Sequence, residues 1–373
     1  MSEMRPEQCL KRSRLEQIAE RNAMNVLVLG GTGAIGASLV SLLGKFASRV
    51  VVTSRQPRES RDNIHYVQGD AKDPVFLGKL LQDHWDAIID FMIYSSDSFS
   101  VKLEQLLSCT EQYFYLSSAR IYAGSGEPVT EASPRLLDVS TDAAFLTTDA
   151  YPLAKARQED LLYKSGKKNW TIIRPYITYG SERLQLGVFE KEAWLYRALQ
   201  GKTVVFNEEM LKCLTTLTNG RDVARAMARL IGESAALGEA FHVTGVTHLN
   251  WEAVLCVYRR ALDEHGVELK LINVDMDSFI SSHNGKYQIL YDRLYDRLFD
   301  NSKISAFINV DDFDPVEDGL YNSILDFLRK PHFRAIDWPH EAMKDRFTQE
   351  FSNPREIGDL KNIFRYLKYR FIK

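Results

Sequence analysis

The sequence has few cysteines, no long hydrophobic run and no excess of charge of one sign. Only four of its 373 residues are cysteines, with no Cys-x-x-Cys pair or histidine cluster, so neither a metal site nor a disulfide framework is expected. No run of 18 apolar residues occurs, and no transmembrane segment is expected. The 47 basic and 50 acidic residues give a formal net charge of −3, which argues against a general nucleic-acid-binding protein, and no DNA partner is expected. These absences favour a reducing, cytoplasmic location.

Short apolar segments alternate with helical patterns through the first half of the chain. Strands are expected at residues 26–29, 49–53, 65–67, 87–91, 113–116 and 170–174. Their hydrophobicity is continuous, which is typical of strands buried on both faces of a parallel sheet. This order predicts right-handed βαβ units and an α/β fold with a Rossmann-type doubly wound parallel sheet. The alternation breaks after Gly180, so a smaller, mixed α/β C-terminal lobe for the substrate is expected to follow.

A glycine-rich turn links the first expected strand to the first expected helix. Gly31, Gly33 and Gly36 fit the pattern G-x-G-x-x-G. Glycine lets the backbone of such a turn approach a pyrophosphate, and the helix N-terminus presents free N–H groups to it. The turn therefore predicts a dinucleotide-binding site. Its candidate residues are Gly30, Gly31, Thr32, Gly33, Ala34, Ile35 and Gly36.

The end of the second strand bears on the type of dinucleotide. Ser54, Arg55 and Arg58 lie there, and no carboxylate occurs before Glu59. A carboxylate would bind the ribose of NAD, whereas arginine suits the 2′-phosphate of NADP. NADP is therefore the preferred cofactor and NAD the alternative. The competing interpretation is that the two arginines belong to a solvated loop.

Two segments carry candidate catalytic groups. Tyr151 and Lys155 are four residues apart, hence on one face of an expected helix. Lys155 would stabilise the phenolate of Tyr151, which suits general acid/base catalysis. Ser117 and Ser118 follow the fifth strand, at the sheet edge where open α/β folds bind ligands. A hydroxyl there would orient a substrate oxygen toward Tyr151, unless the serines only cap a loop.

In this order and spacing, the motifs resemble those of the extended short-chain dehydrogenases/reductases, the NAD(P)-dependent epimerases and dehydratases of nucleotide-sugars. The resemblance covers about residues 25–310 and includes segments 117–122 and 174–180. It implies that Ser118 is the catalytic serine, that Tyr151 is the acid/base, and that Lys155 binds the cofactor ribose beside it.

The same resemblance implies further binding residues. Asp70 would contact the adenine of the cofactor, Pro175 and Tyr176 would line the nicotinamide pocket, and Ser118 and Tyr179 would contact a nucleotide-sugar substrate. A homodimer is the expected assembly.

The sequence departs from the family's dehydratases directly after the serine. Those enzymes carry an Asp-Glu pair there, whereas this chain has Ala119 and Arg120. The residues therefore favour hydride transfer at sugar C4, by an epimerase or a 4-ketosugar reductase, over dehydration. The alternative is a non-catalytic Rossmann protein that binds the cofactor and has a regulatory or RNA-binding role.

Four segments are expected along the chain: an N-terminal extension (1–23), an NAD(P)-binding Rossmann domain (24–180), a substrate lobe with some return to the Rossmann sheet (181–330) and a basic helical tail (331–373). The tail interleaves aromatic and basic residues, so it is expected to pack on its own domain or to contact a partner, an RNA or an acidic membrane surface. Residues 291–298 repeat Tyr-Asp-Arg-Leu once, which predicts a charged amphipathic helix.

Overall fold

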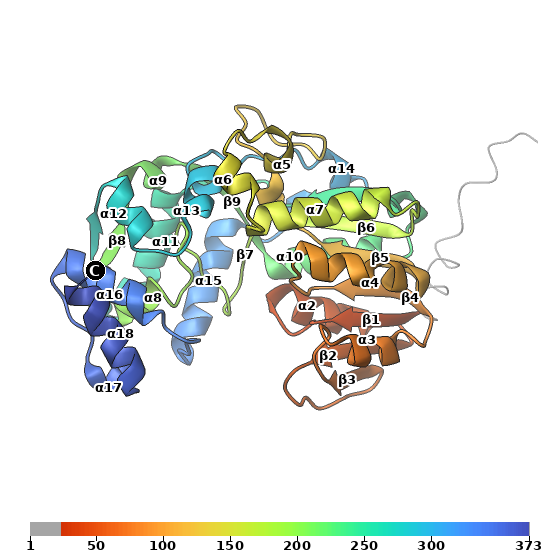
Figure 1. Cartoon of the computed structure of the whole chain (residues 1–373), viewed down its shortest axis with the longest axis horizontal. Coiled ribbons are helices and arrows are strands. Elements are labelled where there is room, and N and C mark those ends of the chain that lie inside the picture. The colour runs from red at the N-terminus through yellow and green to blue at the C-terminus, as the bar shows by residue number, and fades with distance from the viewer. Residues whose placement is uncertain (1–23, 373) are drawn as a thin grey trace, which may run out of the picture. The chain divides into compact units, whose positions relative to one another are not determined.

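A computed structural model describes residues 24–372, so the expected extension at 1–23 lies outside it (Figure 1). The chain divides into two compact units with interleaved segments. Unit 1 comprises residues 1–116, 158–173 and 224–240, and unit 2 comprises residues 117–157, 174–223 and 241–373, each as far as described. The four-segment division made from the sequence remains a prediction.

A seven-stranded sheet has the order β10-β6-β5-β4-β1-β2-β3. Its strands are β1 (Asn25–Leu29), β2 (Arg49–Ser54), β3 (Ile64–Gln68), β4 (Trp85–Asp90), β5 (Thr110–Leu116), β6 (Trp170–Pro175) and β10 (Glu239–Val243). The neighbouring pairs from β3 to β6 are parallel. Because the chain returns past β1 to form β4, the order reverses between these strands, as in dinucleotide-binding sheets. The predicted Rossmann-type fold is confirmed.

The continuous apolar runs form the central strands of the sheet, as their hydrophobicity predicted. The four residues from Val26 to Leu29 are fully buried, because β1 lies between β2 and β4 and is covered on both faces. Helices α2 (Ala34–Leu43), α3 (Pro74–Leu80) and α4 (Ser96–Ser108) follow β1, β3 and β4. Asp73 and Ser95 cap the last two by accepting hydrogen bonds from their first N–H groups.

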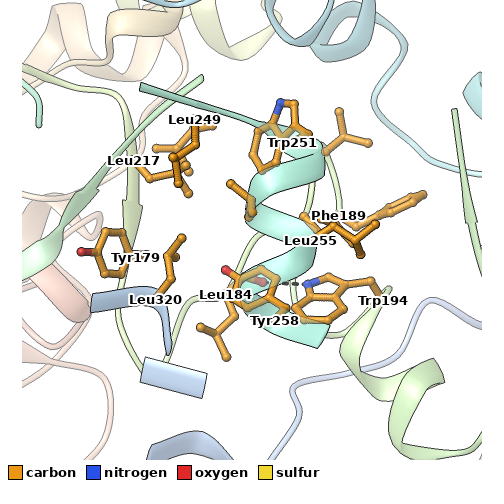
Figure 2. Packing of buried hydrophobic residues seen from close by; sticks show 14 of the residues in the cluster. Tyr179, Leu184, Phe189, Trp194, Leu217, Leu249, Trp251, Leu255, Tyr258 and Leu320 are labelled. Atoms are coloured by element: carbon orange, nitrogen blue, oxygen red, sulfur yellow. Dashed lines mark hydrogen bonds between the residues drawn. The ribbon is translucent and has the colours of Figure 1, made fainter. Parts of the chain in front are cut away.

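Unit 2 contains two smaller sheets and its own core. One sheet has the order β11 (His248–Asn250), β9 (Leu214–Asn219), β7 (Ile177–Tyr179), and the other pairs β12 (Leu271–Asn273) with β8 (Val204–Phe206). Helix α11 (Trp251–Asp263) packs against α15 (Val316–Arg329). Figure 2 shows this core, in which Trp194 stacks on Tyr258 at 4.7 Å between ring centroids.

The remaining helices are mostly short. They are η2 (Ala119–Ile121), α5 (Leu136–Val139), α6 (Ala143–Leu146), α7 (Tyr151–Lys164), α8 (Leu195–Leu199), α9 (Glu208–Lys212), α10 (Gly220–Leu230), η3 (Ser234–Ala236), α12 (Met276–Ser281), α13 (Lys286–Gln288), the π-helix η4 (Ile289–Arg293), α14 (Ser302–Ser305), η5 (Val310–Asp312), α16 (Trp338–Thr348), α17 (Pro354–Ile357) and α18 (Leu360–Phe371).

The C-terminal helices α16, α17 and α18 lie together (blue in Figure 1). A buried carboxylate, Asp345, joins them to the rest of unit 2. It accepts hydrogen bonds from Arg197 at 2.7 Å, Lys202 at 2.9 Å and the Tyr366 hydroxyl of α18 at 2.7 Å. The basic terminal helix is thus anchored on its own unit through Tyr366, which is 2% exposed.

The expectation of a charged amphipathic helix at 291–298 was wrong. A π-helix ends at Arg293, and the charged groups Asp292, Arg293 and Arg297 are buried with at most 2% exposure. Asp292 forms ion pairs with both arginines inside unit 2, which alternating charge along a sequence does not reveal.

Candidate active site

The glycine turn forms a tight bend directly after β1. Gly30 has a φ of +73°, which favours glycine, and its N–H donates to the Thr53 hydroxyl at 2.9 Å. A Cβ on Gly36 would lie 2.8 Å from the backbone of Gly31, so α2 approaches the turn only because position 36 lacks a side chain.

Gly33 has a different environment. A Cβ there would meet no atom within 4 Å, and Gly33 precedes the ten-residue helix α2 without a side-chain hydrogen bond to its first N–H groups. Thr32 lies in the bend, and Ala34 and Ile35 are the first two residues of α2. Open space in front of free N–H groups at a helix N-terminus fits a phosphate group. The residues present therefore fit the pyrophosphate of a dinucleotide.

The loop after β2 places two basic side chains in solvent. Arg55 and Arg58 are exposed, and neither forms an ion pair with a carboxylate in the described range 24–372. The guanidinium of Arg58 lies 6.0 Å from the centre of the Tyr66 ring, and Arg58 and Tyr66 line a hollow at the surface. Ser54 is buried and donates its hydroxyl to the Gln56 carbonyl at 2.8 Å.

Three other predicted cofactor residues have distinct surroundings. Asp70 is exposed and accepts the Lys72 N–H at 2.9 Å. Pro175 ends β6 and is buried. Tyr176 is 5% exposed, and its hydroxyl donates to Asp292 at 3.1 Å. Burial raises the pKa of Tyr176 to about 12, so this phenol stays protonated.

Tyr151 is the first residue of α7, and Lys155 lies one turn later. Lys155 is 2% exposed, and its ammonium lies 6.0 Å from the centre of the Tyr151 ring. Arg157 fixes the start of this helix by donating to the carbonyls of Leu146 and Thr148, at 2.7 and 2.6 Å. The predicted pair is therefore held on one face, with an ammonium beside a phenol.

Ser118 and Tyr151 are connected through Arg120. The Ser118 hydroxyl accepts the backbone N–H of Arg120 at 3.2 Å and caps η2. The guanidinium of Arg120 lies 5.2 Å from the centre of the Tyr151 ring. Ser118 therefore does cap a short helix, but its hydroxyl proton donates to no residue of the described chain. The neighbouring Ser117 hydroxyl is buried without a hydrogen bond within residues 24–372.

Asp292 joins this group to the π-helix. It forms ion pairs with Arg293, with Arg297 at 3.1 Å and with Arg120 at 3.6 Å. Burial acts to raise the pKa of Asp292, but the arginines outweigh it and lower the pKa below its usual value. No sequence pattern indicated this cluster, because Arg120 and Asp292 are far apart in the chain.

Tyr179, predicted to contact substrate, lies in the core of unit 2 (Figure 2). A Cβ on Gly319 would lie 2.0 Å from its hydroxyl oxygen, so the two residues are packed tightly. Burial raises the pKa of Tyr179 well above its usual value. Its role as a substrate contact stays a prediction.

The predicted residues fall in both units. The glycine turn, Ser54, Arg55, Arg58 and Asp70 belong to unit 1, and Ser118, Tyr151, Lys155, Tyr176 and Tyr179 belong to unit 2. Within residues 24–372, no three His, Cys, Asp or Glu side chains are grouped to hold a metal ion. None of the helices in that range is long and apolar enough to span a membrane.

Solved structures with this fold include the epimerase Mth375 from Methanothermobacter thermautotrophicus, at 16% identity and a TM-score of 0.64 over 84% of this chain and 95% of that one. They also include a UDP-glucuronic acid 4-epimerase from Bacillus cereus in complex with NAD, at 16% identity and a TM-score of 0.60 over 82% of this chain and 100% of that one. At such identities the similarity shows the fold alone.

Two curated relatives match in sequence. A chloroplast stem-loop binding protein of 41 kDa from Arabidopsis thaliana is 25% identical over 64% of this chain. A 2'-dehydrokanamycin reductase from Streptomyces kanamyceticus is 24% identical over 62% of it. The matches span 63% and 65% of those two proteins, less than two thirds of each.

The family model described as the NAD dependent epimerase/dehydratase family matches residues 26–244, more than half of the chain. This range begins at β1 and contains the glycine turn, Ser118, Tyr151 and Lys155. The chain belongs to the NAD dependent epimerase/dehydratase family.

Proposed function

We propose that this protein is an NAD(P)-dependent enzyme that transfers a hydride at C4 of a nucleotide-activated sugar, as an epimerase or a 4-ketosugar reductase. The observation that carries the proposal is Tyr151 at the start of α7, with the Lys155 ammonium 6.0 Å from its ring centre. Family membership supports it, as does the fold shared with the UDP-glucuronic acid 4-epimerase.

The glycine turn would hold the pyrophosphate of the cofactor, with the free N–H groups of α2 facing it across the open space at Gly33. When bound, the nicotinamide ring supplies the hydride acceptor or donor. Arg55 and Arg58 favour NADP over NAD, because two exposed guanidiniums without a carboxylate partner in the described chain suit a 2′-phosphate. Asp70, Pro175 and Tyr176 are assigned to the same cofactor.

The residues of unit 2 would handle the proton. Tyr151 would exchange a proton with the sugar oxygen at C4, and Lys155 would stabilise the phenolate that forms. The free hydroxyl proton of Ser118 would hydrogen-bond that same oxygen and orient it. Elimination of water from the sugar needs a general acid and a general base. Ala119 has no acidic or basic group and Arg120 stays protonated at working pH, so these two positions supply neither.

Substitution in α7 tests this assignment. Tyr151→Phe should abolish conversion of whichever nucleotide-sugar the native protein turns over, while cofactor affinity by calorimetry stays within about twofold. Lys155→Ala should lower both the conversion of the nucleotide-sugar and the affinity for the cofactor, since lysine would also hold the cofactor ribose. Tyr163→Phe is the control, because Tyr163 lies on the same helix and is 46% exposed. Full activity of Tyr151→Phe would refute the role of Tyr151.

The cofactor preference has its own test. NADPH should bind more tightly than NADH, and Arg55→Asp should reverse the order. Arg61→Asp is the control, because the Arg61 guanidinium already pairs with Glu59 at 2.9 Å. Equal affinity for both cofactors in the native protein would exclude the NADP assignment and leave the rest of the proposal in place.

RNA binding is a second candidate function, since one curated relative is named for binding a stem-loop. Helix α18 carries Lys361, Arg365, Lys368 and Arg370 and no acidic residue. Stem-loop RNA should then bind with an affinity that falls steeply with salt, and Arg365→Glu with Lys368→Glu should weaken it at least tenfold. Unchanged binding in this double variant would remove α18 from the candidate interface. Homodimer formation and a cytoplasmic location likewise stay predictions.

A further inference from the structure

Arg120 occupies a position beside the proposed acid/base that a general acid or base would otherwise fill. Its guanidinium lies over the Tyr151 ring, 5.2 Å from the ring centre. Its side chain is 20% exposed, whereas its Nε is buried and makes no hydrogen bond within residues 24–372. The two terminal nitrogens also donate to no described residue, but they are not among the buried unpaired atoms, so they reach solvent.

The other two arginines of the cluster are occupied. Arg297 donates to the carbonyls of Tyr122, Ala123 and Tyr291, at 3.3, 2.9 and 2.8 Å. Arg293 donates to the Gly187 carbonyl at 3.0 Å and to the Tyr176 hydroxyl at 3.0 Å. Arg120 differs from both because no carbonyl or hydroxyl oxygen of the described chain accepts its guanidinium.

The cluster also carries an excess of positive charge. Asp292 is the carboxylate that pairs with all three guanidiniums, closer to Arg293 and Arg297 than to Arg120, from which it is 3.6 Å away. Glu190, which also acts on Arg293, already pairs with Arg183 at 3.1 Å. Three cations facing one dedicated carboxylate leave a poorly compensated charge, and the least compensated cation is the one next to Tyr151.

We infer that Arg120 binds a carboxylate on the sugar ring of the substrate, so that the preferred substrate is a nucleotide-activated uronic acid. The planar guanidinium presents paired N–H groups that match a carboxylate. Because Tyr151 acts on the sugar, an anion held beside its ring belongs to the sugar rather than to the diphosphate. A neutral sugar would leave the N–H groups of this partly buried guanidinium without a hydrogen-bond acceptor from the described chain or the sugar carboxylate, and such a mismatch discriminates strongly between substrates.

This inference rests on the proposed function, and equilibrium binding separates the two. The protein is the Tyr151→Phe variant saturated with cofactor, which binds without turnover. The probes are pairs that differ only at C6: UDP-glucose with UDP-glucuronic acid, and UDP-galactose with UDP-galacturonic acid. Calorimetry should give at least tenfold tighter binding of the acidic member of one pair.

Substitutions then assign that difference to one side chain. Arg120→Met should abolish the preference by weakening only the acidic member, and Arg120→Lys should retain part of it. Arg221→Met is the matched control, because Arg221 is 69% exposed and pairs with Asp314, and it should change nothing.

Each remaining outcome contradicts the inference in a distinguishable way. If neither member of any pair binds, the proposed function itself fails for these sugars. If both members bind equally to the protein that retains Arg120, only the uronic-acid assignment is overturned, even if Arg120→Met fails to fold. If Arg120→Met weakens both members equally, the guanidinium serves the diphosphate or the fold.

Discussion

Replacing Asp292 by asparagine should destabilise unit 2 strongly. The carboxylate is 2% exposed and forms ion pairs with Arg293, Arg297 and Arg120. Asn keeps the shape of the side chain but removes the negative charge, so three arginines are left without it. Breaking a buried ion pair from one side costs about 3–5 kcal/mol, a large part of the roughly 5–15 kcal/mol that stabilises a domain.

Urea unfolding monitored by tryptophan fluorescence measures this loss. With a slope of roughly 3 kcal/mol per M, the midpoint should fall by about 1–2 M. Asp296→Asn is the control within the same repeat, because Asp296 is exposed and accepts the Leu214 N–H at 2.7 Å, which an amide oxygen also accepts. The control should change stability by less than about 0.5 kcal/mol.

The pH dependence of the free energy of unfolding should also differ between the native protein and the Asp292→Asn variant. The pKa of Asp292 is lower in the folded protein than the unfolded value near 3.9. The stability that this group contributes is therefore present above about pH 4 and is lost as the pH falls through the folded pKa. The Asp292→Asn variant should not lose stability in this way at low pH, because asparagine does not titrate. A variant as stable as the native protein at neutral pH would refute the buried ion cluster.

Further substitutions at the glycine turn, at Tyr366 and at His283 test local parts of the structure. Gly36→Ala should cost about 1–3 kcal/mol in thermal unfolding because its Cβ would lie 2.8 Å from backbone, whereas Gly33→Ala should leave stability unchanged and weaken dinucleotide binding at least tenfold in calorimetry. Tyr366→Phe should cost about 1–3 kcal/mol in urea unfolding, because its hydroxyl donates to Asp345 and accepts the Ser352 N–H; Tyr369→Phe is the comparison. Burial, with the nearby Lys344 and His340, lowers the pKa of His283 to about 3. Because the unfolded chain then binds a proton that the folded protein does not, the free energy of unfolding should fall by about 2 kcal/mol as the pH drops from above 6.5 to 5. His283→Asn should make the free energy of unfolding less dependent on pH in this range.

The sequence predicted the sheet well because its strands are continuous apolar runs. Val26 to Leu29 could hardly be placed elsewhere than in a buried strand, and the turn that follows required glycine for reasons of space that the structure reproduces at Gly36. The spacing of Tyr151 and Lys155 likewise predicted a shared helical face, since helix periodicity acts over only four residues.

Contacts between distant segments could not be predicted in this way. Asp292 looked like part of a solvated helix, because charge alternation does not distinguish a wet face from a buried cluster. Its pairing with Arg120 depends on tertiary packing across 172 residues of sequence. The same applies to Arg197, which is fully buried and pairs with Glu341 and Asp345 of α16.

Mass spectrometry of the reaction products distinguishes hydride transfer at C4 from dehydration of the sugar. The purified protein is incubated with NADPH or NAD and a panel of UDP-, GDP-, CDP- and dTDP-sugars, including uronic acids and 4-keto sugars. Hydride transfer at C4 predicts either a product of unchanged mass with a new retention time or a product two mass units heavier formed with consumption of NADPH, and in both cases no product from Tyr151→Phe. A product 18 mass units lighter than its substrate would mean dehydration and would contradict the proposed hydride transfer without loss of water.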